Sequence, residues 1–146
     1  MITLRHFGEE DLPVLGRYLL PGRTDDEIRT VLARWETLTW GGRYFEMFAV
    51  LYNSTPVGSV SLFQHSGYII SAGPEIFPEY RRRGYASAGL TLAYEHAKQQ
   101  GYRIAAAEIR KDNTASIRLH EKAGFLRNGE YVNRNGREIY LYLKLL

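Results

Sequence analysis

The first third of the chain carries apolar residues at helical spacing. A first helix is predicted from a stripe that ends at Pro21-Gly22, formed by Leu12, Leu15 and Leu19 with Pro13 in the first turn. A second helix is predicted from four apolar residues that follow a threonine–glutamate capping box: Ile28, Val31, Leu32 and Trp35, after Thr24 and Glu27. A short strand, Thr3–Phe7, precedes both helices.

From Tyr44 onward the period changes to two, which is typical of strands. The alternation predicts an antiparallel hairpin of Tyr44–Leu51 and Val57–Phe63. The next strand, Tyr68–Ile76, contains Gly73-Pro74. Because proline cannot donate a ladder hydrogen bond and glycine often marks a bulge, we expect this strand to bend or part from a neighbour.

The C-terminal half alternates helices with strands. A helix over residues 84–100 and the strand Ile104–Ile109 predict a right-handed parallel crossover from the preceding strand. Another helix begins at Asp112 or Asn113 and stops at Gly124. The last hairpin joins Phe125–Val132 to Glu138–Leu145, whose residues face two ways: Ile139, Leu141, Leu143 and Leu145 on one side, Tyr140, Tyr142 and Lys144 on the other.

The chain length and the element order predict one domain over residues 1–146, of α/β (α+β) class. The chain has no cysteine, so disulfides, thiolate catalysis and cysteine-bound metals are excluded. The N-terminus lacks the apolar core of a signal peptide, and no apolar run approaches the about 18 residues that span a bilayer. We therefore expect a cytoplasmic protein without a membrane partner.

The net charge of +3 is unevenly distributed along the chain. Residues 1–46 hold eight acidic and six basic side chains, whereas the remainder carries a net charge of +5. This division suits an enzyme that takes a polyanionic cofactor on one side and a cationic substrate on the other. A nucleic-acid partner is not expected, because the basic residues line no single long face and form no known binding signature.

The segment Arg81–Ala86 is the strongest candidate for a binding site. Three arginines run into Gly84 at the start of a predicted helix, and small residues follow. A helix N-terminus offers free backbone N–H groups and a partial positive charge, and small residues let an anion approach them closely. The pattern predicts a phosphate or pyrophosphate cradle, although three consecutive arginines are also typical of a solvated surface patch.

Two further residues carry candidate chemistry. His120 lies on the apolar stripe of its helix and points inward, where a histidine is either a hydrogen-bonded core residue or a catalytic group. Glu108 lies near the end of a strand, where ligands bind in open α/β sheets. The four histidines are scattered without metal-ligand spacing, so no metal site is expected.

Two motifs together resemble the GNAT (Gcn5-related N-acetyltransferase) superfamily. Arg81-x-x-Gly84-x-Ala86 is similar to the family's Arg/Gln-x-x-Gly-x-Gly/Ala signature. The segment Glu108–Phe125, with Asn113 and Leu119-His120-Glu121-Lys122-Ala123-Gly124-Phe125, resembles its second motif. The resemblance implies a mixed, mostly antiparallel sheet of six to seven strands with about four helices, splayed at the strand before the Arg81–Ala86 loop.

The resemblance also implies acetyl-coenzyme A (acetyl-CoA) as cofactor and a primary amine as acceptor, either a protein or peptide N-terminus or a small molecule. The acetyl group would pass by direct attack in a ternary complex. The implied cofactor-binding residues are Glu75, Ile76, Phe77, Arg81, Arg82, Arg83, Gly84, Tyr85, Ala86, Ser87, Asn113 and Ser116.

Within the implied mechanism, Glu108 matches the proposed base, which removes a proton from the attacking amine. The family's usual acid is a tyrosine where this chain has His120. Either His120 protonates the leaving thiolate, or Tyr131 or Tyr140 does so, or the thiolate leaves unaided.

Three questions stay open at the level of the sequence. A non-catalytic, regulatory acyl-CoA-binding module is the alternative function, and a homodimer is neither predicted nor excluded. The acceptor pocket is expected from residues 20–45 and the turn near residue 134, a set that suits a peptide, a polyamine or an amino sugar: Arg23, Asp25, Asp26, Trp35, Trp40, Tyr44, Arg134 and Arg137.

Overall fold

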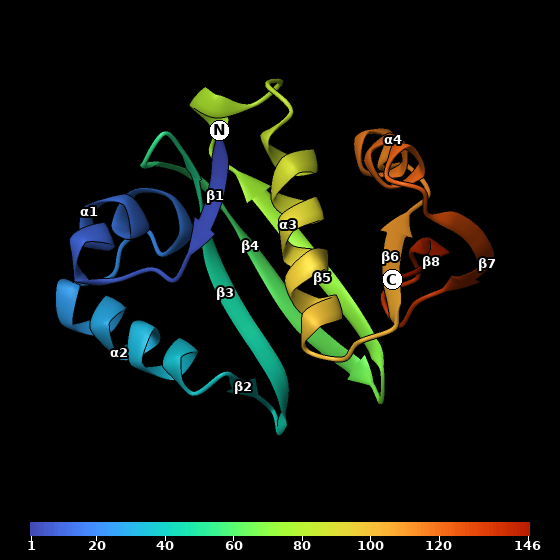
Figure 1. Ribbon diagram of the computed structural model, residues 1–146, viewed down its shortest axis with the longest axis horizontal. Helices are drawn as coiled ribbons and strands as arrows, with labels where there is room; N and C mark the ends of the chain where they lie inside the picture. Colours follow the sequence, from blue (N-terminus) through green and yellow to red (C-terminus); the bar gives the residue numbers. More distant parts are fainter.

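The computed structural model describes residues 1–146, and its centre is a mixed, mostly antiparallel sheet (Figure 1). The strands run in the order β1 (Ile2–Arg5), β3 (Arg43–Tyr52), β4 (Thr55–Ser66), β5 (Ile69–Ile76), β6 (Ile104–Arg110), β8 (Glu138–Leu145) and β7 (Leu126–Val132). Only β5 and β6 are parallel. The two-residue β2 (Thr39–Trp40) pairs with β3 and is the one strand that the alternation did not predict. The predicted fold class is confirmed.

Helices cover both faces of the sheet. They are η1 (Glu9–Asp11), α1 (Leu12–Val14), η2 (Leu15–Leu19), α2 (Asp25–Glu36), η3 (Pro78–Tyr80), α3 (Tyr85–Gln99) and α4 (Thr114–Lys122). The predicted first helix is thus not one regular helix, because it passes from a 3-10 turn through a single α turn into a π-helix. In the π segment the Leu20 N–H donates to the Leu15 carbonyl five residues earlier.

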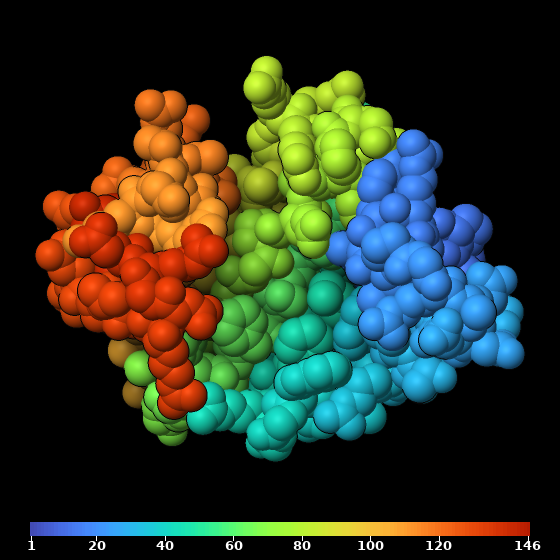
Figure 2. Space-filling view, turned by 180° about the vertical axis from the view of Figure 1, so that it is seen from behind, coloured from blue at the N-terminus to red at the C-terminus, as the bar shows by residue number.

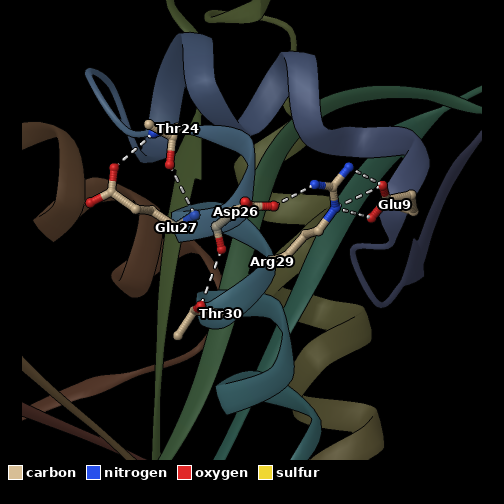
Figure 3. A network of polar contacts seen from close by, with 6 residues as sticks. All are labelled: Glu9, Thr24, Asp26, Glu27, Arg29 and Thr30. Carbon is tan, nitrogen blue, oxygen red and sulfur yellow. Dashed lines mark hydrogen bonds and ion pairs between the residues drawn. The ribbon is translucent and has the colours of Figure 1, made fainter.

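The predicted capping box of α2 is present (Figure 3). The Glu27 N–H donates to the Thr24 hydroxyl at 3.2 Å, and the Thr24 N–H donates to the Glu27 carboxylate at 2.9 Å. One turn along, Arg29 donates to Asp26 and, with its Nε and Nη2, to the Glu9 carboxylate. These contacts fix the start of α2 against η1.

Two apolar cores hold the layers together. The larger lies under α3, where Leu90 and Ala93 pack with Val60, Leu62 and Ile70 of the sheet. The smaller lies on the opposite face, where α1, η2 and α2 cover β1 and β3. The helices on that second face stop at β3, so the outer surface of β4 and β5 has no helix over it (Figure 2).

The final strand alternates as predicted, but its tyrosine side faces the larger core. Tyr142 is buried there and donates a hydrogen bond to the Glu121 carboxylate of α4. Leu145, by contrast, is 81% exposed. Hydropathy alone predicts that the leucine side is covered. The tyrosine side is covered instead, because α4 lies over it.

Candidate active site

The sheet splits between β5 and β6, as the sequence predicts. Only Ile69 with Ile104 and Ile70 with Ala105 pair across the two strands, whereas β5 stays paired with β4 as far as Ile76. Directly after the last of these pairs, the Ser71 hydroxyl donates to the Ala106 carbonyl at 2.6 Å. The two strands then diverge and leave one edge of β5 open.

The open edge of β5 offers unpaired backbone groups. The Ala72 N–H donates to the Tyr94 hydroxyl of α3 and so points away from β4. Because antiparallel residues alternate in direction, Pro74 and Ile76 also point their backbone groups away from β4. Proline has no N–H, so at Pro74 the split leaves no donor without a partner. The Pro74 carbonyl and the Ile76 N–H face the split.

The loop after β5 is shaped by two left-handed residues. Arg82 has a φ of 65° and Gly84 a φ of 80°, and Gly84 is the N-cap of α3. The Arg81 Nε donates to the Ile76 carbonyl at 2.9 Å, which holds the loop against the end of β5. No side chain caps this helix. Its first N–H groups are therefore available to an anion.

A groove of about 930 Å³ lies between this loop and α4. The predicted cofactor-binding residues line it, except Phe77 and Arg83; the full lining is Pro74, Glu75, Ile76, Tyr80, Arg81, Arg82, Gly84, Tyr85, Ala86, Ser87, Arg110, Asn113, Ala115, Ser116 and Leu119. Neither Arg81 nor Arg82 forms an ion pair. Free cations, free amides and a long groove fit a pyrophosphate with an extended arm.

Phe77 lies outside the groove. Its ring is buried and stacks on Tyr18 of η2, with the ring centroids 4.1 Å apart. Its N–H donates to the Val57 carbonyl, and its carbonyl accepts from the Tyr80 N–H. Tyr18 also donates to Glu79, so η2 braces the segment that leads into the loop. Arg83 is exposed and does not line the groove.

Asn113 has a structural contact as well as a place in the groove. Its side-chain oxygen accepts a hydrogen bond from the Ser116 N–H at 3.2 Å and caps α4, as predicted. The side-chain NH₂ of Asn113 is left to donate to a ligand. One residue thus starts the helix and faces the groove.

A second cavity, of about 310 Å³, opens on the other side of the split. Glu108 and His120 line it together, with Phe63, His65, Ser71, Ala72, Gly73, Pro74, Ala106, Ala107, Ile109 and Ser116. Pro74 and Ser116 line both the groove and this cavity. The two spaces therefore meet inside the split. In Figure 2 the split is the notch between the orange α4 segment and the yellow-green loop.

His120 is 4% exposed, and its two ring nitrogens differ. Nδ1 lies 2.8 Å from the Ser116 carbonyl, which can only accept, so Nδ1 carries the proton. Nε2 is buried without a hydrogen-bond partner. Burial lowers the pKa of His120, although the Ser116 carbonyl opposes this, so the ring is neutral near pH 7. In that form Nε2 accepts a proton and does not donate one.

The two tyrosines proposed as alternative acids lie in different surroundings. The pKa of Tyr131 is raised, because partial burial and the neighbouring Glu108 carboxylate both disfavour the phenolate. Tyr140 lies under Lys111 and Arg127, whose cationic groups are 5.0 and 4.5 Å from its ring centroid. Of the two, Tyr131 is beside the predicted base.

Sequence reasoning did not assign a role to Phe63, His65 or Ser71. The sequence around His65 gives no signal, because the register shift between Gln64 and Ser66 becomes visible only when β4 and β5 pair. Such a bulge redirects a side chain, and here His65 lines the cavity. Ser71 lies within the predicted strand Tyr68–Ile76, where no sequence feature distinguishes it.

No group of three or more histidine, aspartate or glutamate side chains is arranged to hold a metal ion. None of the helices combines the length and the apolarity that spanning a bilayer requires.

The profile of the acetyltransferase (GNAT) family matches residues 15–125. No curated protein shows significant sequence similarity to the chain. Among solved structures, an acetyltransferase from Salmonella typhimurium that modifies the N-terminal serine of ribosomal protein L7/L12 has a TM-score of 0.78 at 18% identity, over 99% of this chain and 95% of that chain.

Two further solved structures have a similar fold. A spermidine N-acetyltransferase chimera from Vibrio cholerae and hSSAT has a TM-score of 0.76 at 18% identity, over 98% of this chain and 95% of that one. A putative acetyltransferase from Salmonella typhimurium, solved with acetyl-CoA, has a TM-score of 0.73 at 17% identity, over 99% and 93%.

Proposed function

The chain belongs to the GNAT acetyltransferase family and is an acetyl-CoA-dependent acetyltransferase; on that premise we propose that it acetylates a primary amine by direct attack in a ternary complex. The acceptor is a protein or peptide N-terminus or a small-molecule amine. The observation that carries the proposal is the meeting of the groove and the cavity at Pro74 and Ser116, inside the split. A thioester entering from one side and an amine from the other come together there.

Acetyl-CoA supplies the activated acetyl group as a thioester when it is bound. The N–H groups of Tyr85, Ala86 and Ser87 would hold its pyrophosphate at the positive end of α3, and Arg81 and Arg82 would add their charge. Orientation by fixed amides holds the reacting group still without a cost in reorganisation when the reaction occurs.

The open edge of β5 and the side chain of Asn113 would position the arm of the cofactor. The Pro74 carbonyl accepts and the Ile76 N–H donates, which matches an amide-containing arm laid along the strand. The Asn113 NH₂ donates from α4 on the opposite wall. The groove is thereby lined on both sides by groups that an amide can pair with.

Glu108 acts as the base. An amine is protonated near neutral pH and must lose a proton before it can attack a thioester. Glu108 lines the cavity that opens into the split, and its carboxylate takes that proton directly or through one water. The neutral Nε2 of His120 accepts a hydrogen bond in the same cavity and helps to orient the amine or that water.

Tyr131 is the proposed acid for the leaving thiolate. Two observations argue against His120 as the acid. Burial disfavours the protonated imidazole. The only N–H of the neutral ring already donates to the Ser116 carbonyl. Tyr131 keeps its proton near pH 7, since its pKa is raised, and it lies beside Glu108. We propose that residues 1–146 do this work as a single domain.

The experiment follows coenzyme A release with a thiol reagent, using acetyl-CoA and a panel of amines and peptides. Amine-dependent release that falls at least about a hundredfold in Glu108→Gln, with coenzyme A affinity unchanged, is the expected result. Binding of coenzyme A without release by any amine would support the regulatory acyl-CoA-binding module instead.

A further inference from the structure

An aromatic track leads away from the catalytic cavity across the uncovered face of the sheet. It consists of His65, Phe63, Phe45 and Trp40. The rings of Phe63 and His65 are 6.0 Å apart, and those of Trp40 and Phe45 are 5.9 Å apart. Phe63 and Phe45 lie directly opposite each other in the β3–β4 ladder. The four residues thus occupy neighbouring positions across β4, β3 and β2.

Two of the four rings of the track are open to solvent. Trp40 is 56% exposed and Phe63 is 39% exposed. Neither belongs to an apolar core, although both are large aromatic residues. A row of exposed rings that begins in a catalytic cavity is typical of a surface that binds apolar groups of a ligand.

At the far end, the track reaches a cavity of about 550 Å³ between α2 and β2. Its lining is Leu20, Arg23, Thr30, Val31, Arg34, Trp35 and Trp40. The Arg34 guanidinium lies 5.0 Å from the Trp40 ring centroid. Two cations over an apolar floor favour a group that is negatively charged.

The charges around this cavity leave both arginines available. Neither Arg23 nor Arg34 forms an ion pair. On α2, Asp26 is bound by Arg29, and Glu27 is bound by the Thr24 N–H and acts on Arg23 only as a weaker neighbouring charge. No carboxylate lines the cavity. A carboxylate of the ligand therefore meets no repulsion within the lining.

The span of the track sets the size of the ligand. Glu108 lies on β6 and Trp40 on β2, four strands apart in the sheet. At about 4.8 Å per strand this is about 19 Å, and the split widens it. An extended peptide advances about 3.3 Å per residue, so at least about six residues are needed to bridge the distance. A single amino acid, an amino sugar or a short polyamine does not reach from one end to the other.

We propose that the acceptor is the N-terminus of a polypeptide that lies extended on this track. Its α-amine enters the cavity at Glu108, its first apolar side chains rest on Phe63 and Phe45, and a carboxylate near its sixth residue binds at Arg34 and Arg23. This inference rests on the proposed acetyltransferase function and narrows its acceptor to one class.

The test compares two peptides of about eight residues that have a free N-terminus and apolar residues at the second and fourth positions. One carries glutamate near the sixth position, and the other carries arginine, which adds no second acylatable amine. The values of kcat/KM are measured for the unaltered protein, for Arg34→Glu and for the control Arg118→Glu, which makes the same charge change at an exposed, unpaired site on α4.

We expect the unaltered protein to prefer the glutamate peptide. Arg34→Glu lowers kcat/KM for that peptide about tenfold and raises it for the arginine peptide, because an attraction between opposite charges becomes a repulsion between like charges. A fold defect would lower both values. Arg118→Glu leaves the preference unchanged.

The possible failures are distinguishable. Two results would refute peptide binding on the track and leave the acetyltransferase function intact. In the first, small amines are acetylated as efficiently as the peptides. In the second, Arg34→Glu does not reverse the preference between the two peptides. No acetylation of any amine or peptide, with coenzyme A still bound, would overturn the proposed function itself.

Discussion

Replacing Gly84 with alanine tests the pyrophosphate loop most directly. Gly84 has a φ of 80°, and a Cβ placed there meets nothing within 4 Å, so the substitution acts through the backbone and not through a clash. A non-glycine residue in the left-handed region costs about 1–2 kcal/mol. In the free protein the exposed loop of the variant relaxes to relieve this strain. Anion binding then has to restore the left-handed conformation at residue 84, which costs binding free energy. Coenzyme A should bind about 5- to 30-fold more weakly by titration calorimetry.

Gly101 provides the matched control at the other end of α3. Its φ is 100°, and a Cβ there also meets nothing within 4 Å. Gly101→Ala should therefore lower the melting temperature by about 2–8 °C, as 1–2 kcal/mol does in a chain of this size, without changing coenzyme A affinity. If Gly84→Ala and Gly101→Ala bind coenzyme A equally well, the loop is not the pyrophosphate site.

Three further substitutions test other parts of the structure. His120→Phe should lower kcat at least about tenfold with less than about a twofold change in coenzyme A affinity, and an equal loss of both in single-turnover and binding assays would make the residue structural. Gly58→Ala should weaken coenzyme A binding and cost about 1–3 kcal/mol in urea denaturation, because the new Cβ would lie 2.4 Å from the Glu75 carbonyl oxygen and displace the end of β5; unchanged affinity would contradict this. Burial raises the pKa of Glu46, but hydrogen bonds from Tyr44, His6 and His96 outweigh it and hold the pKa below its usual value. The stabilisation is therefore present above the unfolded pKa of about 4.3 and lost as the pH falls through the folded value, so the gap in unfolding free energy between the unaltered protein and Glu46→Gln should be constant near neutral pH and shrink as the pH falls below about 4.3; a gap independent of pH would refute it.

Local chemistry explains why much of the fold could be predicted. The Thr24 capping box and the Asn113 cap depend on residues close together in sequence, and Gly73-Pro74 predicted that β5 would bend or part from a neighbour. The first helix was predicted as regular because its leucines fit that period, but the observed π turn at Leu15–Leu19 accompanies the stacking of Tyr18 on Phe77, which is distant in sequence.

The residues of the candidate site differ in the same way: local sequence predicts some of them and not others. The loop at Gly84 could be proposed from the sequence because a helix start leaves backbone amides open wherever it occurs, and small residues beside it let an anion approach them. The tautomer of His120 could not, since it depends on the Ser116 carbonyl and on burial of Nε2. Phe77 was included among the cofactor-binding residues because the family resemblance implied it, whereas its N–H and carbonyl are both bound within the protein.

The sequence by itself predicted most of the elements, their order, the candidate anion-binding loop and the family, because periodicity, caps and short motifs act over a few residues; it missed β2 and the π turn of the first helix. Only the tertiary structure decided which sheet face stays uncovered, that the groove and the cavity meet at Pro74 and Ser116, and that Trp40, Phe45, Phe63 and His65 form one track. These features arise from strand register and helix placement. Both are set by packing between segments far apart in the chain, which no local pattern specifies.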